Sequence, residues 1–131
     1  MSILNKVDKN TPPLAAAVEL QRHAASLGFD WPNVQGIFDK IQEEILEVEE
    51  ALQEGNTLAL REEIGDLFFS VINLARFLKI DPDIAIQHSN MKFSKRFHLI
   101  EAEMSAATTF TAEQLEKKWQ QAKIQLKDYE T

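Results

Sequence analysis

Two pairs of acidic residues have the spacing of a divalent-metal site. Glu44 and Glu47 are three residues apart, and so are Glu63 and Asp66. On a helix, residues three apart project from the same side, one turn along. Four carboxylates held together would repel one another unless a cation bound them. Oxygen ligands favour hard ions, so the spacing predicts a Mg²⁺ site that Mn²⁺ can also fill, and hence chemistry on phosphates.

Glutamate-rich helices are usually solvated faces, so the position of the pairs on their helices matters. In the first predicted helix that carries a pair, Glu44 lies at one edge of an apolar stripe and Glu47 lies just outside it. The next predicted helix is apolar on nearly its whole circumference, apart from a stripe of Asp66, Ser70 and Asn73. Such a helix is expected to be buried, with its polar stripe facing the interior or a cleft.

Two further pairs could bind the substrate. Lys92 and Arg96 are four residues apart, and a point charge beside a planar fork suits phosphate oxygens, although a solvated basic face would have the same pattern. Trp119 and Lys123 repeat that spacing, so the indole could stack on a base while the lysine reaches a phosphate. A tryptophan at helical spacing also suits a core. Trp31 is a second stacking candidate, or an anchor at a helix entry.

Helix signals recur along the whole chain, and no segment alternates apolar with polar residues, which predicts an all-α fold. Start signals at Pro12, Asp81-Pro82 and Thr111-x-x-Gln114 and stop signals at Gly28 and Gly55 predict five helices. These helices cover about residues 11–28, 33–54, 57–78, 81–104 and from 111 onward. The short links favour antiparallel neighbours in a bundle, with both acidic pairs near the end that their helices share.

Composition narrows the class of protein. A chain of 131 residues suits one domain over residues 1–131, of which residues 1–10 are expected to be flexible. The absence of cysteine excludes disulfides, thiolate zinc sites and a cysteine nucleophile. No segment resembles a signal peptide or a membrane span, so a soluble cytoplasmic protein is expected. The net charge of −7 argues against electrostatic binding of nucleic acid.

Other catalytic patterns are missing from the sequence. None of the three histidines follows a glutamate by three positions, so the Glu-x-x-His pairs of di-iron bundles do not occur. The sequence also lacks His-Glu-x-x-His, a glycine-rich phosphate loop and a nucleophile elbow. Any catalysis is therefore expected to use a metal ion and water.

Four ordered segments give the sequence a family resemblance over roughly residues 14–126. They are Gly28-Phe29-Asp30-Trp31, Lys40-x-x-Glu43-Glu44-x-x-Glu47, Glu62-Glu63-x-Gly65-Asp66 and Asn90-x-Lys92-Phe93-x-x-Arg96-Phe97. With these segments the chain resembles the MazG-type all-α nucleoside triphosphate pyrophosphohydrolases. It is most similar to the C-terminal catalytic half of the two-domain members.

The resemblance implies hydrolysis of a nucleoside triphosphate to the monophosphate and pyrophosphate, as part of nucleotide-pool housecleaning. It implies that magnesium is held by Glu44, Glu47, Glu63 and Asp66. By the same likeness, Lys92 and Arg96 match phosphate-contacting positions, and Trp119 and Lys123 look like a C-terminal pair used for the nucleotide. Family members are typically dimers or larger oligomers, so a homodimer that completes the helical bundle is also implied.

Three alternatives stay open on the sequence. The chain could be a relative specific for one nucleotide, such as a dUTPase-like or phosphoribosyl-ATP pyrophosphohydrolase-like enzyme. It could instead be a non-catalytic helical module that binds a nucleotide or a partner protein. A bundle without ligands is the weakest alternative, because it leaves Glu63 and Asp66 unexplained beside a buried stripe. The sequence alone does not choose the base or the sugar.

Overall fold

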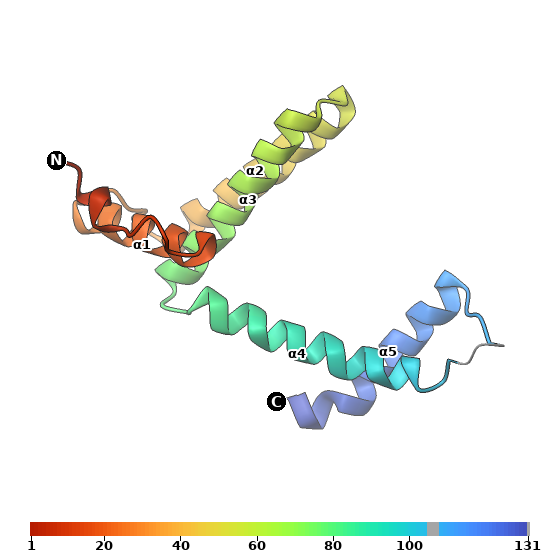
Figure 1. Cartoon of the computed structure of the whole chain (residues 1–131). Coiled ribbons are helices and arrows are strands. Elements are labelled where there is room, and N and C mark those ends of the chain that lie inside the picture. The colour runs from red at the N-terminus through yellow and green to blue at the C-terminus, as the bar shows by residue number, and fades with distance from the viewer. Residues whose placement is uncertain (105–107, 131) are drawn as a thin grey trace. The chain divides into compact units, whose positions relative to one another are not determined.

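The computed structural model describes residues 1–104 and 108–130. Those residues form five α-helices and a short 3-10 helix, with no strand among them, which confirms the all-α class (Figure 1). The chain divides into two compact units, Met1–Asp83 and Ile84–Thr131, which we call the N-terminal and C-terminal units. A single functional domain over residues 1–131 and a flexible segment over residues 1–10 stay predictions.

The N-terminal unit consists of the 3-10 helix and the first three α-helices. Their bounds are η1 Ile3–Lys6, α1 Pro13–Ser26, α2 Val34–Glu54 and α3 Thr57–Phe77. Helices α2 and α3 form an antiparallel hairpin and lie side by side along their length (Figure 1). Helix α1 packs against α3 and also contacts η1. The antiparallel pairing of the two acidic helices is therefore as expected.

Local capping chemistry explains the helix ends in this unit. The Asn33 side chain accepts a hydrogen bond from the backbone of Gln35 at 3.0 Å and caps α2. Gly55 ends α2 in the left-handed region, at φ 68°, where a side chain would be strained. Asn56 then caps α3 by accepting from the backbone of Ala59 at 3.1 Å. Helix α1 starts one residue later than predicted, with Pro13 as its first residue.

The burial pattern of the hairpin differs from the prediction on α3. The buried residues of α2 are Ile37, Glu44 and Ala51, which are spaced seven apart and so form one seam. On α3, however, the buried residue is Ser70 of the polar stripe, whereas Phe68 is 65% exposed. The expectation that α3 is buried all round is therefore wrong for its apolar faces. Helices α1 and α2 cover only part of its circumference, and they cover the polar stripe at Ser70.

The C-terminal unit contains α5 and nearly all of α4. Helix α4 spans Pro82–Glu101 and begins as predicted, because the Asp81 side chain accepts from the backbone of Asp83 at 2.9 Å. It ends at Glu101 rather than near residue 104. Helix α5 spans Ala112–Glu130 and opens with the predicted capping box. Thr111 Oγ1 accepts from Gln114 N at 3.2 Å, and Gln114 Oε1 accepts from Thr111 N at 2.9 Å.

Candidate active site

Three of the four predicted metal ligands come together between α2 and α3. Carboxylate oxygens of Glu44, Glu63 and Asp66 all lie within 4.8 Å of one another. Glu44 is buried, Glu63 is half-buried and Asp66 is exposed. Glu44 lies near the middle of α2 and Asp66 near the middle of α3, and the two are equally far along the chain from Gly55. The group therefore lies at mid-length of the hairpin, not near the shared end as expected.

Glu47 belongs to the same group of carboxyls. In its protonated form it can hydrogen-bond to Glu44 and also to Glu63, and this, with a smaller contribution from burial, raises the pKa of Glu47 to about 7. A carboxyl that keeps its proton near neutral pH is the expected response to neighbouring negative charge. We call Glu44, Glu47, Glu63 and Asp66 the carboxylate cluster.

Two oxygens of the carboxylate cluster are buried without a hydrogen-bond partner in the structure, Glu44 Oε2 and Glu63 Oε2. The other oxygen of Glu44 accepts from the Lys40 ammonium at 3.0 Å, which raises the pKa of Lys40. Lys40 is thus a salt-bridge partner of Glu44, one turn away on the same helix. Unpaired buried carboxylate oxygens are costly. An all-oxygen set with two such atoms suits a hard divalent cation, so these residues fit Mg²⁺ or Mn²⁺.

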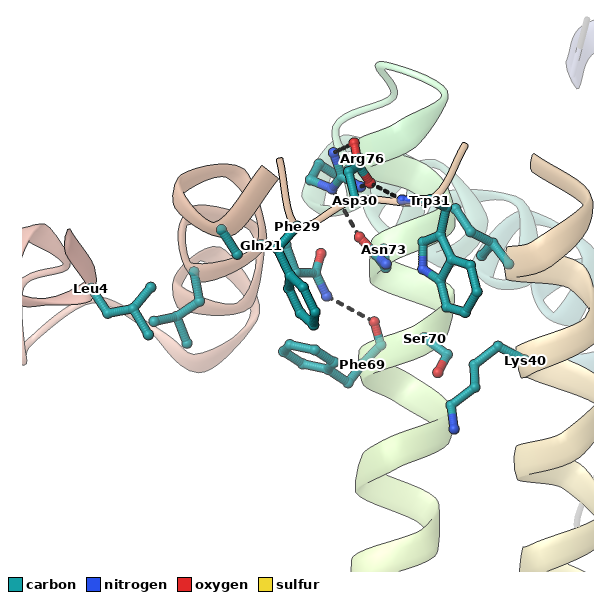
Figure 2. Close-up of a pocket in the computed structure, with 13 residues that line it drawn as sticks. Leu4, Gln21, Phe29, Asp30, Trp31, Lys40, Phe69, Ser70, Asn73 and Arg76 are labelled. Carbon is teal, nitrogen blue, oxygen red and sulfur yellow. Dashed lines mark hydrogen bonds and ion pairs between the residues drawn. The ribbon is translucent and has the colours of Figure 1, made fainter. Parts of the chain in front are cut away.

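A cavity of about 560 Å³ opens beside the carboxylate cluster, between α1, α2 and α3 (Figure 2). Two lining residues connect it to the cluster, because Lys40 binds Glu44, and Ser70 lies one turn after Asp66 on α3. Most of its walls are apolar or aromatic side chains, including Trp31. That size and lining are typical of sites for small organic ligands.

The tryptophan at the cavity wall is held by a polar clamp. Asp30 pairs with Arg76 of α3, with Oδ1 and Nη2 2.6 Å apart, and Arg76 Nε donates to Asn73 Oδ1 at 2.8 Å. This pairing holds the pKa of Asp30 below its ordinary value. Gly36 makes room for the ring, because a Cβ there would lie 2.7 Å from Trp31 Cε3. The wall of the cavity is therefore preorganised.

The four predicted substrate-binding residues lie in the C-terminal unit. Arg96 of α4 stacks on Trp119 of α5, with its Cζ 5.5 Å from the ring centroid, and Phe93 packs on the same indole. Lys92 is half-buried, and Lys123 is exposed one turn after Trp119. The structure thus brings together one member of each predicted pair, Arg96 and Trp119.

Sequence reasoning missed some of the polar residues around the cavity. Ser70 and Asn73 belong to the polar stripe that was expected to face the interior or a cleft, and both line the cavity, whereas Gln21 and Arg76 were not assigned a role and Asp30 was noted only within a family segment. Asp30 and Arg76 are far apart in the sequence, so no local spacing signals their pairing. Gln21 lies on a helix whose pattern otherwise reads as ordinary amphipathic packing.

A comparison with known protein families gives a match over the residues of the carboxylate cluster. The profile of the MazG nucleotide pyrophosphohydrolase domain matches residues 33–99, which include the carboxylate cluster, Lys92 and Arg96. This chain belongs to the MazG family. Trp119 and Lys123 lie outside the part that this MazG profile matches.

Two relatives match almost the whole chain. The chain is 36% identical over 126 residues to the nucleoside triphosphate pyrophosphohydrolase/pyrophosphatase MazG of Thermotoga maritima, covering 93% of this chain and 48% of that protein. It is 37% identical over 130 residues to the nucleoside triphosphate pyrophosphohydrolase of Escherichia coli (strain K12), covering 95% of this chain and 49% of that protein. The chain thus spans about half the length of these relatives.

A third relative matches a shorter segment. The uncharacterized protein YabN of Bacillus subtilis is 40% identical over 68 residues, which are 49% of this chain and 14% of that protein.

Within the described residues, no helix of this MazG chain has the length and apolarity needed to cross a membrane.

Proposed function

We propose that this chain hydrolyses nucleoside triphosphates to the monophosphate and pyrophosphate, using Mg²⁺, for which Mn²⁺ can substitute. The observation that carries the proposal is the carboxylate cluster with its two buried, unpaired oxygens. Its place beside a cavity large enough for a nucleoside adds support. So do the relatives that bear the name nucleoside triphosphate pyrophosphohydrolase.

In this proposal, Glu44, Glu47, Glu63 and Asp66 hold the metal. A bound Mg²⁺ would neutralise phosphate charge and lower the pKa of an attacking water. Lys40 stands at the boundary between the carboxylate cluster and the cavity, where an ammonium can meet the α-phosphate end of a nucleotide. Positioning and charge neutralisation are the main sources of rate in phosphoryl chemistry of this kind.

Four residues of the C-terminal unit are also proposed to contact the substrate. Arg96 and Lys92 would bind phosphate oxygens, and Trp119 and Lys123 would bind the nucleotide. The contact between Arg96 and Trp119 supports a shared role, because each side chain holds the other in place. Hydrogen bonds from a guanidinium to phosphate remain possible while its face lies on an aromatic ring.

We further propose that the protein is a homodimer that clears unwanted nucleotides in the cytoplasm. The exposed apolar side chains of α3, such as Phe68 and Val71, support a partner subunit, because a monomer would leave them in water. The relatives named nucleoside triphosphate pyrophosphohydrolase favour a free nucleotide as the substrate. The acidic net charge also argues against a nucleic acid as the substrate.

The role of the carboxylate cluster is tested by Glu47→Gln and Asp66→Asn, assayed on nucleoside triphosphates at limiting Mg²⁺. Glu50→Gln is the matched control, because Glu50 is exposed on the same helix and lies outside the cluster. We expect each cluster variant to fold, by circular dichroism, and to lose more than about a hundredfold in activity, beyond what loss of an outer-shell partner costs. Full activity of both variants would exclude the metal assignment.

A further inference from the structure

Gln21 of α1 has an unexplained polar atom at the cavity. The side chain is 7% exposed and lines the cavity. Its Nε2 donates to the backbone oxygen of Phe69 at 3.0 Å, as Figure 2 shows, whereas its Oε1 is buried without a partner. Buried amide oxygens are nearly always paired, so this atom indicates a missing hydrogen-bond donor.

The orientation of the Gln21 amide is fixed by the α3 backbone. Turning the amide over would place Oε1 against the carbonyl oxygen of Phe69, where two acceptors would face each other. Oε1 must therefore stay an acceptor, and a ligand that reaches it has to offer an N–H or O–H group. Phe29 lies beside the amide in Figure 2 and is 83% exposed, so it can rotate to admit a ligand without repacking a core.

The position of Gln21 selects the part of a nucleotide that it would meet. Lys40, which is bonded to Glu44, lies on the other side of the cavity in Figure 2. A nucleotide with its phosphates at the carboxylate cluster would reach into the cavity with its base, along the wall formed by Trp31. The base atoms farthest from the glycosidic bond are the substituents at purine position 6 and pyrimidine position 4.

We propose that this cavity is the nucleobase pocket and that Gln21 Oε1 selects bases with an amino group at those positions over their oxo counterparts. The inference rests on the proposed function for the placement of the phosphates. Adenine and cytosine offer N–H donors to Oε1, whereas hypoxanthine and uracil offer a carbonyl oxygen. An oxo base would leave two acceptors facing each other in a buried site, which is the arrangement that gives strong rejection.

Two matched substrate pairs test the selection, because ATP differs from ITP, and CTP from UTP, only at that substituent and in the proton on the adjacent ring nitrogen. For the wild-type protein we expect kcat/KM to favour the amino member of each pair by about tenfold or more. In Gln21→Met, which keeps the length of the side chain and removes the acceptor, the ratio should fall toward one. Gln42→Met, at an exposed position of α2, is the control and should keep the wild-type ratio.

Binding of the monophosphates separates this inference from the proposed reaction. Isothermal titration with AMP against IMP, and CMP against UMP, requires no turnover. Tighter binding of AMP and CMP that Gln21→Met abolishes would support the pocket even if no triphosphate were hydrolysed. Equal wild-type affinities and equal kcat/KM values within both pairs would overturn it. If Gln21→Met does not fold by circular dichroism, the wild-type ratios alone decide.

Discussion

At the scale of single residues, the carboxylate cluster concentrates negative charge that the surrounding side chains only partly offset. Lys40 supplies one positive charge to Glu44, and hydrogen bonding of protonated Glu47 to Glu44 and Glu63 raises the pKa of Glu47 to about 7. A proton and a metal ion are thus alternative ways of neutralising the same oxygens. The competition between the proton and the metal ion for these oxygens should change the stability of the protein with pH.

Stability in the absence of divalent metal should depend on pH through Glu47. The pKa of Glu47 is higher in the folded protein, about 7, than its ordinary value of 4.5. Its stabilising contribution is therefore complete below pH 4.5 and is lost as the pH rises through 7. We expect the Tm in EDTA to fall between pH 5 and pH 8, and Glu47→Gln to flatten that dependence, while Glu50→Gln leaves it unchanged.

Addition of Mg²⁺ should reverse the trend, because it replaces the proton. The rise in Tm on adding Mg²⁺ is expected to be larger at pH 8 than at pH 5. A Mg²⁺ effect of equal size at both pH values would contradict the assignment of Glu47 to the cluster.

A second residue-scale prediction concerns Arg96 in the C-terminal unit. Arg96→Lys keeps the charge but loses the planar fork and its stacking on Trp119. We expect KM for the triphosphate to rise by roughly tenfold, from the loss of about 1.4 kcal/mol of binding. Lys95→Met, a change at the exposed neighbouring position, should leave KM nearly unchanged.

At the scale of helices, most helix ends were predictable from the sequence, whereas the tertiary contacts around each helix were not. Caps such as Asn33 and Thr111 act on backbone groups two or three residues away, so the sequence contains the whole interaction. The carboxylate cluster was predictable for a related reason, because a short turn at Gly55 can only return α3 along α2. The clamp between Asp30 and Arg76 depends on tertiary packing, and no short-range pattern reports it.

The exposure of α3 was mispredicted because an apolar circumference indicates only that the helix surface should be buried. It does not indicate whether the same chain or a second chain buries it. The same distinction applies to Gln21. Its residue type and spacing suit an ordinary helix position, and only the carbonyl of Phe69 shows that one amide oxygen is left over.

Two glycines inside helices give a matched prediction at this scale. A Cβ at Gly65 of α3 would meet nothing within 4 Å, whereas a Cβ at Gly36 of α2 would meet Trp31 Cε3 at 2.7 Å. Gly65→Ala should therefore raise the free energy of unfolding by about 0.5–1 kcal/mol, because alanine favours the helix. Gly65 consequently does not serve close helix approach within the chain.

Gly36→Ala gains the same helix propensity but displaces the indole from the cavity wall. We expect it to lose stability relative to Gly65→Ala in urea unfolding and to weaken AMP binding. A Gly36→Ala protein that binds AMP as well as the wild type would show that the position of Trp31 is not important for the cavity.

At the scale of the whole molecule, the exposed apolar side chains of α3 are the strongest sign of a missing partner. Phe68 and Val71 are 65% and 46% exposed, and residues three apart on a helix lie on the same face. Large apolar patches on soluble proteins usually mark interfaces. A second copy of the chain would also cover the hairpin that carries the carboxylate cluster, which would link assembly to activity.

Assembly is predicted to depend on that surface. Light scattering coupled to size exclusion should give a mass near twice 15.0 kDa for the wild-type chain. Phe68→Ser should shift the protein toward the monomer and lower its activity in parallel, whereas Leu27→Ser, at an exposed leucine that follows α1, should not. A wild-type mass near 15.0 kDa at micromolar concentration would contradict the proposed homodimer.

Identifying the products of hydrolysis would decide whether the chain has the proposed pyrophosphohydrolase activity. The purified chain would be incubated with each common ribo- and deoxyribonucleoside triphosphate, in Mg²⁺ and in EDTA, and followed by phosphorus NMR. We expect pyrophosphate and the nucleoside monophosphate in equal amounts, with turnover only in Mg²⁺. Orthophosphate with the diphosphate, or no turnover of any nucleotide, would contradict the proposed activity.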